Sequence, residues 1–163
     1  MDELEKKRFQ FRPERITTLF IGESPPDCGS FFYNENSLLY RQMKESFKEL
    51  WIDGADFLQT FKGRGFFLDD LVLFPINKNG GKERSRLRWE GSGSLAARLR
   101  QYQPNAIVAL MCAIEPMVRS AARSAALDIP IYVTAFPRPE HQERFRKEMA
   151  EIIPNLPTAV GHR

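Results

Sequence analysis

The hydrophobic and polar positions along the chain alternate between short apolar runs and helical stripes. Apolar, β-branched runs, typical of buried parallel strands, occur at residues 16–21, 65–75, 106–111 and 129–135. Apolar residues at helical spacing occupy residues 38–50, 55–61, 95–102, 115–126 and the segment after Pro139. Strands that alternate with helices predict a mostly parallel sheet covered on both faces. We therefore predict an α/β protein, a three-layer α/β/α sandwich of about four strands, with the strand order left open.

The first strand stops abruptly at the sequence Gly22-Glu23-Ser24-Pro25-Pro26. Gly22 allows a positive φ, and the two prolines cannot donate further ladder hydrogen bonds. A stiff polar loop at the carboxyl end of a first strand is where open α/β sheets bind ligands. An ordinary strand-to-helix connection has the same pattern, so both interpretations stay open here.

Two adjacent aspartates, Asp69 and Asp70, interrupt the apolar run at residues 65–75. Because neighbours on a strand face opposite ways, one carboxylate can reach solvent while the other points into a cleft. A buried carboxylate without partners is costly, so it needs donors or takes up a proton. Alternatively, the strand ends early and both aspartates cap the following turn.

Residues 76–93 are polar and contain Asn79-Gly80-Gly81, which predicts a functional or mobile loop. A helix beginning at Ser92-Gly93-Ser94 would present free backbone N–H groups, which suit a phosphate. The candidate phosphate-binding residues are Ser92, Ser94, Arg86 and Arg88. Basic residues crowd this region, namely Lys82, Arg84, Arg86, Arg88, Arg98 and Arg100. The cluster indicates a nucleic-acid or phosphate partner, or else a solvated surface.

Length and charge narrow the class of protein. The 163 residues suit a single domain over 1–163, with a charged lead-in at 1–15 and a tail at 154–163. A net charge of +3 permits a polyanionic partner. No apolar run approaches the roughly 20 residues that span a bilayer, and no apolar segment follows the first charges. We expect a cytoplasmic protein without membrane contact, and a monomer.

The chain has two cysteines, Cys28 and Cys112, without CxxC spacing or a nearby histidine. This pattern argues against a cysteine-built zinc site or iron–sulfur cluster. We expect two buried, reduced thiols and neither a metal nor a cofactor.

The strand that runs into Gly-Glu-Ser-Pro-Pro resembles the first motif of the uracil-DNA glycosylase superfamily, whose bacterial and thermophile branches carry Gly-Glu-Ala-Pro-Gly. The resemblance implies the glycosylase fold and a substrate-binding motif that includes Gly22 and Ser24. It also implies that Glu23 or Asp27 places a water or polarises the sugar. An aromatic residue beyond the motif would stack on an extruded base, and the candidates are Phe32 and its neighbours Phe31 and Tyr33. Core and loop packing explains these aromatics equally well.

Two positions depart from the family pattern. Asp70 stands where the family has an asparagine that donates to uracil O4 and accepts from N3–H. An ionised aspartate only accepts, which better suits an exocyclic amino group, as on cytosine or adenine. Phe136-Pro137-Arg138 stands where the family often has His-Pro-Ser. Arg138 would then supply the positive charge, or His141 would approach the cleft; alternatively, His141 is a surface residue.

Two functions follow, and whether the protein is an enzyme stays open. The first is a hydrolase of DNA repair, a base-excision N-glycosylase with altered base specificity, with a carboxylate near the sugar and a cation near the leaving base. The second is a catalytically inactive module of the same fold that binds a nucleic acid or a nucleotide. Single-stranded or damaged DNA is the expected partner. Both hypotheses require residues 22–33, Asp69 or Asp70, and Arg138 or His141 to meet at the carboxyl edge of the sheet.

Overall fold

The computed structural model describes residues 2–48 and 56–159. Its sheet has four parallel strands in the order β2-β1-β3-β4. The strands are β1 (Thr18–Gly22), β2 (Phe66–Asp70), β3 (Ala106–Ala109) and β4 (Ile131–Val133). The register pairs Gly22 at the end of β1 with Asp70 at the end of β2. The predicted α/β class and parallel four-stranded sheet are confirmed.

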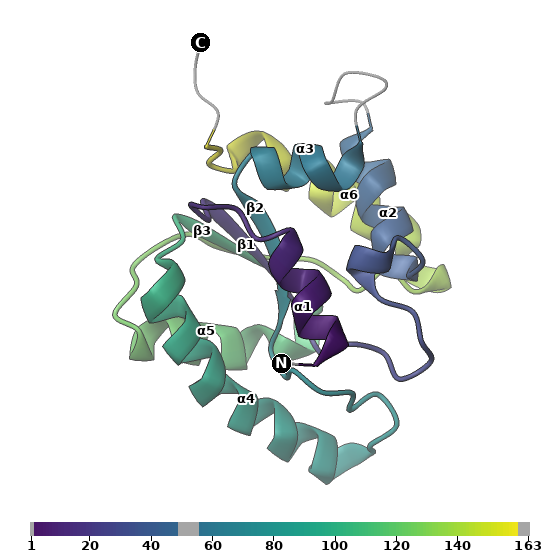
Figure 1. Ribbon diagram of the computed structural model, residues 1–163. Helices are drawn as coiled ribbons and strands as arrows, with labels where there is room; N and C mark the ends of the chain where they lie inside the picture. The colour runs from purple at the N-terminus through teal and green to yellow at the C-terminus, as the bar shows by residue number, and fades with distance from the viewer. Residues whose placement is uncertain (1, 49–55, 160–163) are drawn as a thin grey trace.

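Helices cover the sheet on both faces, consistent with an α/β/α sandwich (Figure 1). One face carries α2 (Leu38–Phe47), α3 (Phe57–Gly63) and α6 (Gln142–Ile152). The other face carries α4 (Gly81–Tyr102) and α5 (Glu115–Ser124). No helix in the described part of the chain is long and apolar enough to cross a membrane. The predicted ends of two helices, at Leu50 and at residue 55, lie outside the described residues.

An aromatic core joins the sheet to α2 and α3. Phe20 of β1 is fully buried, and its ring centroid lies 5.3 Å from that of Phe61 and 5.5 Å from that of Phe66. Helix α2 begins where the Ser37 hydroxyl accepts a hydrogen bond from the Tyr40 N–H. The apolar stripe of α2 then packs inward, as its helical spacing predicts.

Tyr33 completes the outer edge of the sheet. Its hydroxyl donates to the Leu68 carbonyl at 2.9 Å and accepts from the Leu68 N–H at 2.7 Å. Strand β2 is an edge strand, and an edge strand leaves backbone groups that need partners. Tyr33 is therefore a structural residue, and only its neighbours Phe31 and Phe32 are available to a ligand.

The charged lead-in contains a helix that the sequence pattern did not predict, α1 (Glu3–Gln10). The Asp2 carboxylate caps it by accepting from the Glu5 N–H. Its apolar stripe is sparse, and the helix is anchored through Arg8, which is only 2% exposed. The contacts of Arg8 therefore help to place this segment, together with Phe11, whose ring stacks on that of Tyr33.

Helix α4 begins at Gly81, so the predicted loop to Gly93 and the predicted helix start at Ser92 were wrong. Ser92, Gly93 and Ser94 lie in the middle of the helix, where their N–H groups face preceding carbonyls. The glycines suggested a break, but Gly91 serves packing. A Cβ on Gly91 would lie 2.7 Å from the Leu71 carbonyl oxygen. The glycine permits close approach of α4 to the chain after β2.

Gly91→Ala should lower the free energy of unfolding by about 1–3 kcal/mol, because the added methyl group meets a backbone oxygen that has little room to move. Gly93→Ala is the matched control, since a Cβ there meets no atom within 4 Å. That control should stabilise by up to about 1 kcal/mol through helix propensity. Urea unfolding of both variants measures the contrast; equal effects of the two substitutions would contradict the packing role of Gly91.

Candidate functional site

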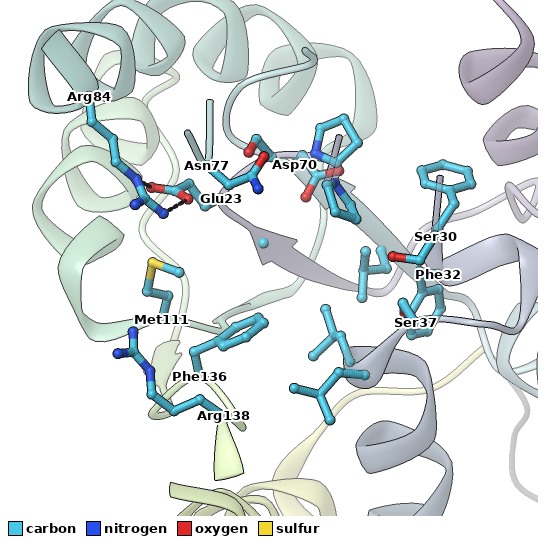
Figure 2. Close-up of a pocket in the computed structure, with 18 residues that line it drawn as sticks. Glu23, Ser30, Phe32, Ser37, Asp70, Asn77, Arg84, Met111, Phe136 and Arg138 are labelled. Carbon is cyan, nitrogen blue, oxygen red and sulfur yellow. Dashed lines mark hydrogen bonds and ion pairs between the residues drawn. The ribbon is translucent and has the colours of Figure 1, made fainter. Parts of the chain in front are cut away.

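A pocket of about 440 Å³ lies at the carboxyl edge of the sheet (Figure 2). The residues that follow all four strands contribute to its walls, together with the start of α2 and the first turns of α4. The predicted convergence is confirmed for the loop after β1, for Asp70 and for Arg138. Gly22, Ser24 and Phe32 also line this pocket, whereas Asp27 and His141 do not.

Asp70 brings a buried carboxylate to the pocket. Its Oδ2 accepts from Arg8 Nη2 at 3.0 Å, while its Oδ1 has no hydrogen-bond partner among residues 2–48 and 56–159. That free oxygen lies beside Gly22, where a Cβ would come within 2.8 Å of it. Gly22 is therefore needed for close approach, and it does not use the positive φ that a glycine allows. Burial raises the pKa of Asp70 to about 6 despite the Arg8 charge.

Asp69 and Asp70 share the buried cation Arg8, which answers the question of how two adjacent aspartates fit into a buried strand. Arg8 Nη1 lies 3.7 Å from Asp69 Oδ1, and Arg98 of α4 donates to Asp69 Oδ2 at 2.5 Å. Burial alone would lower the pKa of Arg8, but the charges of Asp70 and Asp69 raise it well above its usual value. Both aspartates are buried, and only Asp70 lines the pocket.

Glu23 is held by two arginines from α4. Arg84 donates from Nε to Oε2 at 2.8 Å and from Nη2 to Oε1 at 2.5 Å, and Arg88 Nε donates to Oε2 at 2.6 Å. Burial would raise the pKa of Glu23, but these hydrogen bonds and charges outweigh it and lower the pKa below its usual value. Glu23 is thus an ionised carboxylate with both oxygens occupied (Figure 2).

Asp27 lies outside the pocket, at the surface of the loop after β1. It accepts from Asn77 Nδ2 at 3.1 Å and lies 3.3 Å from Lys78 Nζ. The Asn77 hydrogen bond and the Lys78 charge lower the pKa of this exposed carboxyl. Asp27 therefore positions Asn77, which lines the pocket, rather than facing a ligand itself.

The apolar walls come from phenylalanines. Phe32 is 4% exposed and packs edge-on against Tyr33 and Tyr40, so most of its ring belongs to the core. Phe31 also lines the pocket, with the Arg8 guanidinium 5.2 Å from its ring centroid. Phe136 presents a partly exposed ring to the pocket (Figure 2).

Arg138 lines the pocket next to Phe136, and its side chain is exposed. Its guanidinium has no ionic or hydrogen-bond partner in the described part of the chain. His141, three residues later, is half-buried in the short 3₁₀ helix Pro139–His141 and does not reach the pocket.

Most of the predicted basic segment is paired within the protein. Arg86 bonds to Glu83 and Glu90 on the surface of α4, and Arg100 donates to the Ser124 carbonyl at 3.0 Å. Ser92 and Ser94 do not line the pocket. The phosphate site predicted at Ser92, Ser94, Arg86 and Arg88 therefore loses its helix N-terminus, and of these arginines Arg88 alone reaches Glu23 at the pocket wall.

Both cysteines are exposed, so the prediction of buried thiols was wrong. Within residues 2–48 and 56–159, no group of three or more His, Cys, Asp or Glu residues could hold a metal ion.

Sequence reasoning did not assign Asn77, Arg84 or Met111 to the site, although all three line the pocket. Arg84 and Arg88 are four residues apart, so they share one helix face once α4 is known to start at Gly81. That spacing was the available signal, and it was hidden by the glycines around residue 91.

No protein-family model matches the sequence, and no curated protein matches it.

Proposed function

We propose that this pocket binds the base of a nucleotide, in a uracil-DNA-glycosylase-like protein that recognises the base without cleaving its glycosidic bond. The observation that carries the proposal is the free Oδ1 of Asp70. It is an acceptor at the pocket wall, fixed in place through Oδ2 by Arg8 and uncovered because Gly22 lacks a side chain. The pKa of Asp70 is about 6, so at a higher pH the side chain is an ionised carboxylate that only accepts hydrogen bonds. It therefore suits an exocyclic amino group, as on cytosine or adenine.

The size and walls of the pocket support a planar ligand. A volume of about 440 Å³ falls in the range of pockets for small molecules. Phe136 offers a partly exposed ring, and stacking a base on an aromatic ring contributes about 1–3 kcal/mol. Phe31 and Phe32 enclose the same space. A base that stacks on the Phe136 ring and donates from its amino group to Asp70 would use both the aromatic wall and the free carboxylate oxygen.

The electrostatics favour recognition over cleavage. Cleavage of an N-glycosidic bond builds positive charge on the sugar, and a carboxylate near the sugar stabilises that charge. Glu23 is the carboxylate implied by the resemblance, but Arg84 and Arg88 occupy both of its oxygens. Arg84, Arg88 and Glu23 together carry a net positive charge, which would destabilise a cationic sugar beside them. Asp27 and His141, the other catalytic candidates, lie outside the pocket.

A DNA N-glycosylase is the second candidate, favoured by one observation. The Glu23 side chain is only 5% exposed and stays ionised at the pocket wall. A ligand that drew the arginines away would leave a carboxylate able to stabilise a cationic sugar. This function requires that movement, whereas base binding requires none.

Calorimetric titration with deoxycytidine and deoxyuridine at pH 8 tests the first proposal. Deoxycytidine should bind about tenfold more tightly, the order expected when a buried acceptor gains rather than lacks a donor. No base should be released from single- or double-stranded oligonucleotides that contain uracil, hypoxanthine or xanthine, as measured by mass spectrometry. Base release by the wild type that Glu23→Gln abolishes would instead establish the second candidate. Failure of both nucleosides to bind would contradict the base pocket.

A further inference from the structure

We infer that the ligand of this pocket carries a phosphate group, which binds to Arg84 and Arg138 at the pocket wall. The inference rests on the proposed base pocket and adds the class of ligand. It starts from an imbalance of charge: Arg84 and Arg88 both pair with a single carboxylate, Glu23, and the cationic Arg138 lines the same pocket. Elsewhere around the pocket the charges are matched, since Arg8 and Arg98 face Asp69 and Asp70.

Glu23 holds the arginines of α4 in place without using all of their donors. Arg84 donates to Glu23 from Nε and Nη2, and its Nη1 has no acceptor within residues 2–48 and 56–159. The Arg84 side chain is 29% exposed and lines the pocket, so this donor is open to a ligand. Without Glu23 the two arginines would repel each other across one helical turn. The buried carboxylate therefore preorganises a cationic surface.

Arg138 supplies the second open cation. It arrives from the loop after β4, on the same side of the pocket as Met111 and the Glu23–Arg84 pair (Figure 2). Its whole guanidinium is without a partner in the described structure, and its side chain is exposed. An unpartnered arginine that shares a pocket with Arg84, whose Nη1 also lacks an acceptor among the described residues, forms a site for an anion.

Phosphate is the anion that this arrangement fits best. Arginine donates in a planar fork that matches phosphate oxygens, and such charge-assisted hydrogen bonds are about twice as strong as neutral ones. Asp70 and the arginines lie on different walls of one pocket (Figure 2). A base at Asp70 and a phosphate at Arg138 and Arg84 describe a single nucleotide unit. That unit is either a free nucleotide or one residue of a single strand.

The test is a calorimetric titration at pH 8 and low salt with deoxycytidine, its 5′- and 3′-monophosphates, and a trinucleotide of deoxycytidine. A phosphorylated ligand should bind at least about tenfold more tightly than the nucleoside, as expected for charge-assisted hydrogen bonds. This advantage should shrink as salt is added. Arg138→Gln should abolish most of the difference between nucleoside and nucleotide. Arg123→Gln is the matched control, because Arg123 is exposed on α5 and does not line the pocket.

The outcomes separate the two levels of the inference. A monophosphate that binds more tightly than the trinucleotide identifies a free nucleotide, and the reverse identifies a strand; either supports the phosphate site. Equal affinities of nucleoside and all phosphorylated ligands would overturn the phosphate site and leave the base pocket intact. Binding of inorganic phosphate that is lost in Arg138→Gln, without any nucleoside binding, would keep the phosphate site and overturn the base pocket.

Discussion

Replacing Arg8 by methionine is expected to lower the free energy of unfolding by about 3–5 kcal/mol, the cost of leaving a buried charge without its partner. The Arg8 side chain is 3% exposed, and it lies 3.0 Å from Asp70 and 3.7 Å from Asp69. Methionine preserves much of the volume but leaves the Asp70 carboxylate without its counter-charge. Urea unfolding followed by circular dichroism measures the loss. Lys6→Met on the same helix is the control, because Lys6 pairs with Glu3 in solvent and such pairs contribute about 0–1 kcal/mol.

The loss in Arg8→Met should depend on pH. In the wild type, burial raises the pKa of Asp70 from 3.8 to about 6, so its contribution to stability is fully present below about pH 4 and is lost as the pH rises through about 6. Removal of Arg8 takes away the charge that opposes this rise, so the pKa moves higher still. Protonation of Asp70 then relieves the unpaired charge, and the loss of stability should be smaller at pH 5 than at pH 8. The double variant Arg8→Met with Asp70→Asn should recover part of the loss at pH 8. Equal losses at both pH values, with no recovery in the double variant, would contradict a charge-based role for Arg8.

Asp70→Asn should reverse the preference of the pocket between amino-bearing and oxo-bearing bases. The ionised wild-type carboxylate and uracil O4 are both hydrogen-bond acceptors, so they cannot bond to each other, whereas an asparagine amide can donate to O4. A hydrogen bond at a buried polar group is worth about 1–3 kcal/mol, so the ratio of the two Kd values should change by about 10- to 100-fold. The wild type is accordingly expected to bind uracil poorly and to be at best a poor uracil-excision enzyme at neutral pH. Titration of both proteins with deoxycytidine and deoxyuridine measures the ratio, with unfolding curves recorded in parallel because Arg8 loses a charged partner.

The same preference should shift with pH in the wild type alone. As the pH falls through about 6, the pKa of Asp70, the carboxyl gains a proton and becomes a donor. Affinity for deoxyuridine, and any release of uracil, should then rise, while affinity for deoxycytidine falls. Because an asparagine amide does not titrate, Asp70→Asn should show a flat profile between pH 5 and 8. Rapid uracil release at neutral pH by both the wild type and Asp70→Asn would contradict the conclusion that the ionised Asp70 carboxylate disfavours uracil.

Several features of this protein follow from its sequence alone. Parallel strands covered on both faces are continuous apolar runs, so residues 16–21 and 106–111 predicted β1 and β3 within two residues. The apolar stripe over residues 38–50 predicted α2, which spans Leu38–Phe47, for a similar local reason. Because residues that end parallel strands meet at one edge, Asp69 or Asp70 and Arg138 or His141 could be assigned to a common region. The structure selected Asp70 and Arg138 from these alternatives.

The tertiary structure alone decided which charges meet. Arg8 and Asp70 are 62 residues apart, and Glu23 lies 61 and 65 residues from Arg84 and Arg88. No local pattern encodes such pairings, because a charged side chain chooses its partner through the packing of distant elements. Helix α4 shows the same limit: Gly91 signals a break locally, yet the close approach of the Leu71 carbonyl makes it an interior residue. These long-range contacts bind one oxygen of Asp70 to Arg8 and leave the other without a partner. They also place two arginines, Arg84 and Arg88, against the single carboxylate of Glu23.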